Sequence, residues 1–253
     1  MGMGNFYDKM AKKFGGYAFS NSKSKYTSEC PNGDPEQVFK EKLLELAGSE
    51  CAALDIGCGD GKFAFEIANR FSEITGLDSS KELLAIAVAK MKEFHIENTS
   101  FVFGDAKNTP FKDASFNIIF NRRGPSFYAE YARLLKKGGY YVEIGIGEKD
   151  AMALKKVFGR GQNYGSWNES RLESDKKELE KVGFKFIFAK DYYCSEYYLS
   201  PAEFKIFLQG VPIFEDFDTN KDKKYLESYY KEYQKPKGIV LARHRVVYVA
   251  RKI

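Results

Sequence analysis

The sequence predicts an α/β fold: a doubly wound, seven-stranded sheet that is mostly parallel, with an antiparallel strand at one edge. Short apolar runs alternate with helical patterns of about a dozen residues, which is typical of a parallel sheet with helices on both faces. The last apolar run has no regular crossover helix just before it, so we expect it to be the antiparallel edge strand. The strand-like runs are 51–56, 73–78, 100–105, 116–121, 140–146, 184–193 and 239–251.

The first helix between these strands has clear end signals. Over residues 34–48, Asp34 is placed as the N-cap, Pro35 at the first helical position, Gln37 to reach back to the cap, and Gly48 as the stop. Further helices are expected after the glycines of 57–61, over 80–94 behind a serine cap, over 125–136 and over 170–182.

Two segments lie outside this alternation, although the whole chain, 1–253, is expected to be a single domain. Residues 1–33 are aromatic but weakly periodic, and we expect them to cover the functional site through side chains such as those of Tyr7, Phe14, Tyr17 and Tyr26, the alternative being a packing arm. Residues 195–236 contain helical pieces that begin with a capping box at Ser200, in an insertion longer than a turn requires. This insertion predicts a small helical lid or substrate-shaping segment, with structural padding as the alternative.

Composition excludes several classes of protein. An apolar fraction of 43% and a charged fraction of 30% fit a globular protein, and no apolar run approaches the roughly 20 residues of a membrane helix. The net charge of +5 permits an RNA or anionic partner without requiring one. The cysteines, Cys30, Cys51, Cys58 and Cys194, lack paired spacing and nearby histidines, so we expect neither disulfides nor a metal site. The absence of expected disulfides in turn predicts a cytoplasmic location.

The stretch LDIGCGDGKF, residues 54–63, places three glycines directly after the first predicted strand. Such a turn lets backbone approach a ligand closely, and it lies where ligands bind in open α/β sheets. A dinucleotide fingerprint would need glycine where Lys62 stands. The turn therefore predicts a site for another nucleotide-like cofactor, the alternative being a simple tight turn.

The series Asp55-x-Gly57-x-Gly59-x-Gly61 resembles motif I of the class I S-adenosylmethionine-dependent methyltransferases, and the resemblance extends over roughly 38–252. It implies a Rossmann-like fold and S-adenosyl-L-methionine as cofactor. It also implies an acid after the second strand for the ribose hydroxyls, and an acid with a small residue after the third strand for the adenine. The cofactor-binding residues implied are Asp55, Gly57, Cys58, Gly59, Gly61, Asp78, Ser79, Asp105, Ala106 and Asn121.

The resemblance to ubiquinone- and menaquinone-biosynthesis enzymes implies transfer of a methyl group to a small molecule by in-line displacement. No catalytic residue is identified, since orientation alone can supply much of the acceleration. The fourth strand ends in NRRGP, which departs from the N/D-P-P-Y/F motif of amino-directed nucleic-acid methyltransferases. An RNA methyltransferase remains an alternative, as does a protein that binds the cofactor without catalysis.

Three residues are candidates for substrate binding. Arg122 and Arg123 would bind a carboxylate or phosphate, the alternative being surface salt bridges, and Tyr17 comes from the predicted cover. His244 lies in the middle of the last strand and is expected to be structural rather than a general base.

Overall fold

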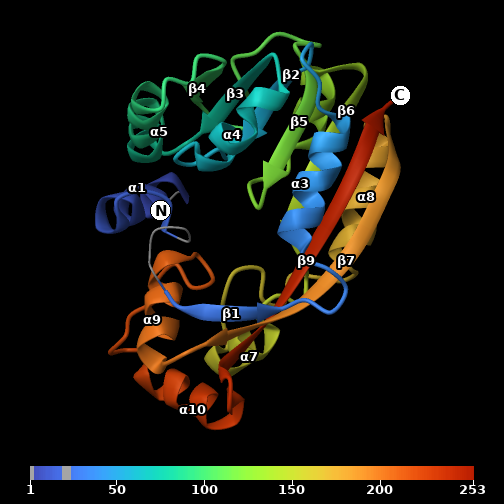
Figure 1. The fold of residues 1–253 in the computed structure, drawn as a ribbon. Helices are drawn as coiled ribbons and strands as arrows, with labels where there is room; N and C mark the ends of the chain where they lie inside the picture. The colour runs from blue at the N-terminus through green and yellow to red at the C-terminus, as the bar shows by residue number, and fades with distance from the viewer. Residues whose placement is uncertain (1–2, 19–23) are drawn as a thin grey trace.

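The structure, a computed structural model, describes residues 3–18 and 24–253. It is a mixed sheet covered by helices on both faces (Figure 1). Parts 1–2 and 19–23 of the predicted cover segment lie outside the described residues. The strands are β1 (Tyr26–Glu29), β2 (Ala52–Ile56), β3 (Glu73–Asp78), β4 (Thr99–Phe103), β5 (Phe116–Arg122), β6 (Leu135–Ile146), β7 (Phe184–Tyr198), β8 (Gln234–Lys235) and β9 (Gly238–Lys252).

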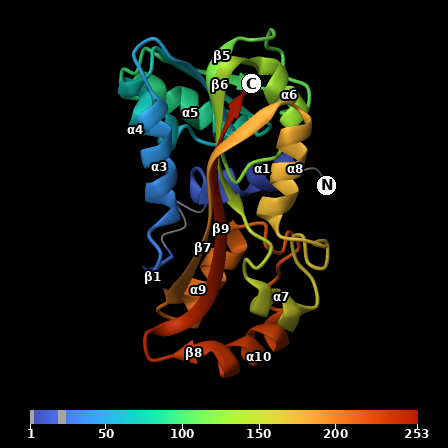
Figure 2. The ribbon, with the colours of Figure 1, turned by 90° about the vertical axis from the view of Figure 1, so that its right-hand side faces the viewer.

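Helices cover the two faces of the sheet in separate groups. In Figure 2, α3 and α4 lie on one side of the strands, and α6 and α8 lie on the other. Each group buries its own apolar cluster against the strands. The helices are α1 (Met3–Phe14), α3 (Pro35–Leu46), α4 (Lys62–Ile67), α5 (Lys81–Glu93), α6 (Tyr128–Leu134), α7 (Met152–Phe158), α8 (Arg171–Lys181), α9 (Pro201–Gly210) and α10 (Lys223–Tyr233), with a short 3-10 turn over Ala68–Arg70.

The described part of the chain forms a nine-stranded sheet in the order β1-β7-β9-β6-β5-β2-β3-β4, with β8 paired to β9. β2 to β6 are parallel to one another, which confirms the predicted parallel core. β9 is antiparallel to its neighbours, as expected, but it lies between β6 and β7, and β1 forms the outer edge. The edge position predicted for the last strand was therefore wrong, because β7 extends the sheet beyond it. Residues 246–250 of β9 are all buried, as an interior strand with both faces covered requires.

The ends of α3 differ in part from the prediction. Asp34 is the N-cap and accepts a 2.9 Å hydrogen bond from the Glu36 N–H. Gln37 donates instead to Glu41, one helical turn onward, and the helix ends at Ala47. The reach-back by Gln37 was therefore wrong, whereas Gly48 directly follows the C-cap, in agreement with the predicted stop.

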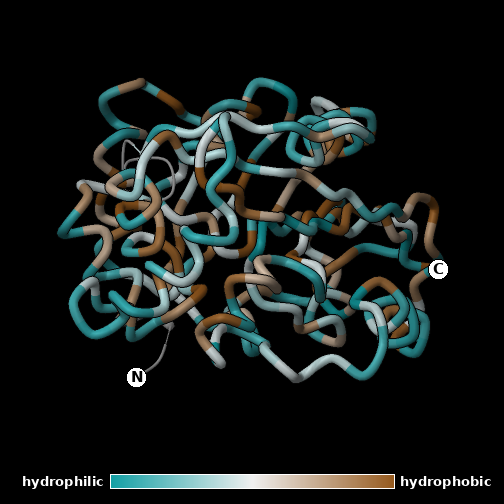
Figure 3. Tube along the Cα trace, turned by 90° about the horizontal axis from the view of Figure 1, so that it is seen from below, coloured by the Kyte–Doolittle hydropathy of each residue, from teal (hydrophilic) through white to brown (hydrophobic). Residues whose placement is uncertain are grey.

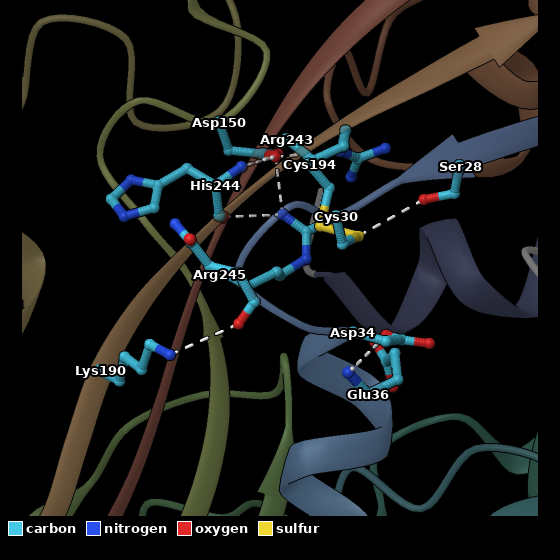
Figure 4. Close-up of a disulfide and its surroundings, with 11 residues drawn as sticks. Ser28, Cys30, Asp34, Glu36, Asp150, Lys190, Cys194, Arg243, His244 and Arg245 are labelled. Carbon is cyan, nitrogen blue, oxygen red and sulfur yellow. Dashed lines mark hydrogen bonds and ion pairs between the residues drawn. A yellow bond between two sulfur atoms is a disulfide. The ribbon is translucent and has the colours of Figure 1, made fainter.

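A disulfide joins Cys30 to Cys194, contrary to the expectation from the sequence. The pairing of β1 with β7 explains it, since Glu29 lies opposite Ser195 and the next pair along this antiparallel register is the two cysteines. Because β1 itself was not predicted, the spacing of the cysteines gave no sign of this contact. Figure 4 shows the bridge beside a group of buried charged side chains. Cys51 and Cys58 are not bridged.

The insertion after β7 contains α9 and α10. With α7 they form a third apolar cluster, which includes Leu154, Phe204 and Tyr229. These helices lie together at the far end of β7 and β9 (Figure 1). Along the whole trace, hydrophilic residues predominate on the outer loops (Figure 3). The lid role of this insertion stays a prediction.

None of the helices within residues 3–18 and 24–253 combines the length and the apolar character needed to cross a lipid bilayer.

Candidate cofactor-binding site

Left-handed glycines shape the turn between β2 and α4. Gly57, Gly59 and Gly61 have φ angles of +71°, +58° and +74°, which residues other than glycine rarely adopt. A Cβ added to Gly59 would meet no atom within 4 Å, so this residue leaves open space. A Cβ on Gly61 would lie 2.7 Å from the ring of Phe101 and 2.8 Å from that of Phe65. Gly59 thus opens the site, whereas Gly61 permits α4 to pack closely.

Hydrogen bonds fasten this turn to the end of β3. The N–H groups of Gly57 and Cys58 donate to the Leu77 carbonyl at 2.8 and 3.2 Å. The Gly59 N–H donates to Asp78 Oδ2 at 2.8 Å. These N–H groups are therefore bound within the protein, and the turn offers a ligand close approach rather than donors.

Asp78 stands at the carboxyl end of β3 and faces the cavity. Its two oxygens accept backbone hydrogen bonds, from Gly59 at Oδ2 and from Ser80 at Oδ1, the latter also at 2.8 Å. Burial raises the pKa of this carboxyl, and the backbone donors oppose that rise. Because a carboxylate has about four lone-pair sites, each oxygen can accept a further hydrogen bond.

A cavity of 650 Å³ lies beside the turn and the end of β3. A cavity of this size is large enough for a nucleoside and a small second molecule. Most of the residues predicted for cofactor or substrate line it. They are Asp55, Gly57, Cys58, Gly59, Asp78, Ser79, Asp105, Ala106, Tyr17, Arg122 and Arg123.

Two predicted residues, Gly61 and Asn121, do not line the cavity. Asn121 is fully buried, and its amide accepts from the Gly124 N–H and donates to the Pro125 carbonyl, both at 2.7 Å. It also donates to the Tyr141 hydroxyl at 3.3 Å. Asn121 therefore shapes the turn after β5, and Gly124 and Pro125 of that turn line the cavity instead.

Asp55 is a buried carboxyl in the wall of the cavity, with an exposed fraction of 3%. Burial raises its pKa to about 7, although the cation of Arg122 acts in the opposite direction. A positive ligand beside Asp55 would favour its ionised form.

Arg122 and Arg123 form ion pairs with the same carboxylate, that of Glu36 at the start of α3. The Arg122–Glu36 distance is 2.9 Å. Burial alone would raise the pKa of Glu36, but Arg123 and Arg122 lower it to about 2. These arginines thus line the cavity and also form ion pairs, while their binding of a substrate stays a prediction.

The segment before α3 supplies one wall of the cavity. Tyr7, Tyr17 and Tyr26 line it, whereas Phe14 does not. The Asp8 carboxylate fixes α1 to the start of α5, accepting from the Ser80 hydroxyl at 2.5 Å and from the Glu82 N–H at 3.3 Å. These contacts place the segment over the edge of the cavity that contains Asp78.

Some lining residues were not predicted. Leu83 comes from the first turn of α5, and Gln162 from the loop after α7. Neither belongs to a motif, and the contribution of Gln162 depends on a chain reversal that no local pattern indicates.

His244 lies away from the cavity and has structural contacts. Its Nδ1 accepts from the Lys149 N–H at 3.2 Å, and its Nε2 lies 2.8 Å from Asp191 Oδ1. The ring also stacks on Tyr193. The described residues contain no group of three or more His, Cys, Asp or Glu side chains placed to bind a metal ion.

The fold and the site together define an α/β protein with a cofactor cavity at the carboxyl ends of its central parallel strands. Residues 53–139 match the family described as a methyltransferase domain. The matched region, about a third of the chain, contains the glycine turn, Asp78 and Asp105.

Curated relatives carry methyltransferase names. An uncharacterised methyltransferase of Bacillus subtilis, YcgJ, is 34% identical over 47% of this chain and 54% of its own length. A demethylmenaquinone methyltransferase of Staphylococcus haemolyticus is 30% identical over 55% of this chain and 64% of its own length. The putative 23S rRNA (guanine-N(1)-)-methyltransferase YxjB of Bacillus subtilis is 29% identical over 55% and 51%. The chain thus spans about half to two thirds of these relatives' lengths.

Solved structures share the Rossmann-like fold. A functionally unknown protein of Deinococcus radiodurans has a TM-score of 0.65 at 18% identity, with 98% of this chain and 99% of that one covered. A geranyl diphosphate C-methyltransferase of Streptomyces coelicolor, in complex with Mg²⁺, geranyl diphosphate and S-adenosyl-L-homocysteine, has a TM-score of 0.54 at 18% identity, with 86% and 77% covered.

Proposed function

We propose that the protein binds S-adenosylmethionine in this cavity and transfers its methyl group to a small-molecule acceptor. The observation that carries the proposal is the hydrogen-bonded unit of Gly59 and Asp78, which sets an open backbone turn beside a carboxylate at the cavity edge. The cofactor supplies a methyl group on a positively charged sulfonium, which is already activated for displacement.

The residues present fit this cofactor. Asp78 would accept the hydrogen bonds of the two ribose hydroxyls, because its oxygens retain lone pairs. Asp105 and Ala106 line the cavity after β4, in the position proposed for the adenine. Asp55, buried in the wall, would favour the cationic end of the cofactor.

The remaining wall would orient the acceptor and exclude water. Burial raises the pKa of Tyr7 and of Tyr26, so both hydroxyls stay protonated at neutral pH and can donate hydrogen bonds. Orientation of the acceptor toward the methyl group would supply much of the rate acceleration. This function therefore requires no nucleophilic side chain.

An RNA acceptor is the second candidate, because one relative carries the name of a ribosomal RNA methyltransferase. Incubation with methyl-labelled cofactor separates the two. We expect the label to enter a metabolite extract and not bulk RNA, and binding of the cofactor without transfer to either would support a non-catalytic role.

Substitution of Asp78 tests the cofactor site. Asp78→Ala should raise the dissociation constant of S-adenosylmethionine about 10- to 100-fold, because hydrogen bonds to a charged group contribute about 1.5–3 kcal/mol each. Calorimetric titration measures the change, with Glu97→Ala, at an exposed acid outside the cavity, as the control. An unchanged dissociation constant in a folded Asp78→Ala variant would show that the ribose assignment is wrong.

A further inference from the structure

The two arginines at the end of β5 converge on one side of the chain. Consecutive strand residues normally point to opposite faces, but Arg123 lies just past the strand with a φ of +65°. This left-handed conformation breaks the alternation, and Glu36 consequently binds both Arg122 and Arg123. Both arginines also line the cavity. We call these three residues the arginine pair and its carboxylate.

One carboxylate serves two guanidinium groups here. The single negative charge of Glu36 is thus shared by two guanidinium groups. A cation that is largely removed from water is costly unless an opposite charge accompanies it. An anionic group of a ligand would give Arg122 a second acceptor of opposite charge.

The guanidinium of Arg122 has donors to spare. It lies over the ring of Phe63 at 4.2 Å, and within the described part of the chain Glu36 is its only hydrogen-bond partner. Its Nε is buried and has no partner among those residues. Since a guanidinium has five N–H donors in a planar fork, Arg122 suits a carboxylate or phosphate.

The acids in the layer of charges behind the pair do not hydrogen-bond to Arg122. Asp150 accepts from Arg243 at 2.9 Å and from Arg245 at 2.6 Å, and Glu196 accepts from Arg243 at 2.9 Å. These two arginines and two carboxylates balance one another, as Figure 4 illustrates for Asp150, Arg243 and Arg245. Asp55 also interacts electrostatically with Arg122, while its burial disfavours its own ionised form.

The walls around the pair are aromatic. Tyr7 and Tyr17 lie with their ring centroids 6.3 Å apart, and Tyr26 is stacked on Tyr198 at 5.2 Å. These three lining tyrosines present ring surface together with hydroxyl groups. Such a wall favours an apolar or aromatic ligand body.

We infer that the methyl acceptor is an organic anion whose carboxylate or phosphate group binds Arg122 and Arg123 and whose apolar part lies against the lining tyrosines. The role of the ligand as methyl acceptor rests on the proposed function. Its negative charge is inferred from the two guanidinium groups in the wall and from the unpartnered Nε of Arg122.

The test is a titration of the full-length protein, with and without saturating S-adenosyl-L-homocysteine. The probes are benzoate, phenyl phosphate and the neutral benzamide, and calorimetry measures the binding of each. We expect at least one of the anions to bind ten times more tightly than benzamide, and the stronger of the two identifies carboxylate or phosphate as the group recognised. Equal binding of all three probes would overturn the inference.

Matched variants give effects of opposite sign. Glu36→Gln removes the competing carboxylate and should tighten anion binding several-fold, whereas Arg123→Met should weaken it about tenfold and leave benzamide unaffected. Arg122→Lys and Arg123→Lys, which retain the charge, should keep part of the preference. General damage would lower binding in every variant, so it cannot produce the tighter binding expected of Glu36→Gln. If circular dichroism shows that Glu36→Gln is folded, a loss of anion binding in this variant would contradict the inference.

A second readout uses label transfer. A metabolite extract is divided on an anion exchanger before the reaction, and each part is incubated with methyl-labelled cofactor. Label should enter the retained part, and phosphatase treatment of that part beforehand abolishes transfer only if the group is a phosphate. Transfer confined to the unretained part would refute the anionic acceptor but leave the methyltransferase proposal intact, whereas failure to bind S-adenosyl-L-homocysteine would speak against the proposed function itself.

Discussion

Asp78 has two tasks, because it holds the glycine turn in place through Gly59 and also faces the cavity. Its carboxylate keeps the turn in its open shape before a ligand arrives, so little ordering of this backbone is needed on binding. The adjacent Ser80 N–H fixes the second oxygen. A carboxylate fixed at both oxygens can only accept hydrogen bonds in a defined direction, which suits recognition of a pair of hydroxyls.

The ionisation of Asp55 should make cofactor affinity depend on pH. Its pKa of about 7 lies above that of a free carboxyl, so the group is largely neutral below pH 6 and ionised above pH 8. The ionised form attracts the positively charged cofactor, and affinity for S-adenosylmethionine should therefore rise several-fold from pH 6 to pH 8. Calorimetric titration at a series of pH values measures this rise.

Two comparisons isolate Asp55 in that experiment. Asp55→Asn should flatten the dependence, because the amide does not titrate in this range. S-adenosyl-L-homocysteine lacks the sulfonium charge and should show a smaller rise. A steep dependence that persists in Asp55→Asn would assign the effect to another group. The raised pKa of Asp55 should also lower the stability of the ligand-free protein as pH rises from about 4 to 7. In this range the unfolded chain releases the proton of Asp55, whereas the folded protein retains it.

Most site residues were predictable because they belong to a motif at strand ends. Gly57, Gly59 and Asp78 follow two successive strands, and parallel strands bring such ends to one edge. Asn121 has the expected position, but the hydrogen bonds of its amide to Gly124 and Pro125 depend on a tertiary turn. The sharing of Glu36 by both arginines depends on the left-handed Arg123, which no propensity favours.

Among the elements, those with strong local signals were predicted closely. The bounds of β3 agree with the sequence, and serines cap two helices as expected: Ser80 accepts from Leu83 and Ser200 from Glu203. Ser170 caps α8 in the same way, accepting from Glu173. β1 and α7 were missed. β1 has only four residues, mostly exposed, and exists because β7 extends far enough to pair with it. α7 begins at the left-handed Ala151 and has no side-chain cap.

The disulfide should stabilise the attachment of β1 to β7. A variant with Cys30→Ser and Cys194→Ser should lose about 2–5 kcal/mol of unfolding free energy, because the bridge restricts the unfolded chain. Urea denaturation of the oxidised protein and of the variant gives the difference. Cys51→Ser, which leaves the bridge intact, is the control. Coincident denaturation curves for the double variant and the oxidised protein would exclude a stabilising role.

Across the whole molecule, Asp150 connects the loop after β6 to β9. Its carboxylate accepts from the side chains of Arg243 and Arg245 and from the His244 N–H. Burial alone would raise the pKa of Asp150, but the two arginines hold it below that of a free carboxyl. The cluster joins the parallel part of the sheet to the end that holds the helical insertion.

Removal of the Asp150 charge should destabilise the entire fold. Asp150→Asn leaves the buried Arg245 without its anion and Arg243 with Glu196 alone, and should cost about 3–5 kcal/mol in urea denaturation at pH 7. Because the folded-state pKa is depressed, the contribution is present above about pH 4 and is lost as pH falls below the unfolded value. The stability difference between Asp150→Asn and the parent should therefore shrink in acid. Glu169→Gln, in an exposed ion pair with Lys177, should change stability by less than about 0.5 kcal/mol.

The Cys30–Cys194 bridge also closes the chain into a covalent ring whose ends are 164 residues apart in sequence. All five parallel strands, β2 to β6, belong to this ring. α1 lies in the N-terminal tail before the ring, and α9 and α10 lie in the C-terminal tail after it. A single protease nick within the ring would thus leave both fragments joined, so the band on a denaturing gel would split only after a thiol is added. A nick in either tail would release a fragment without one.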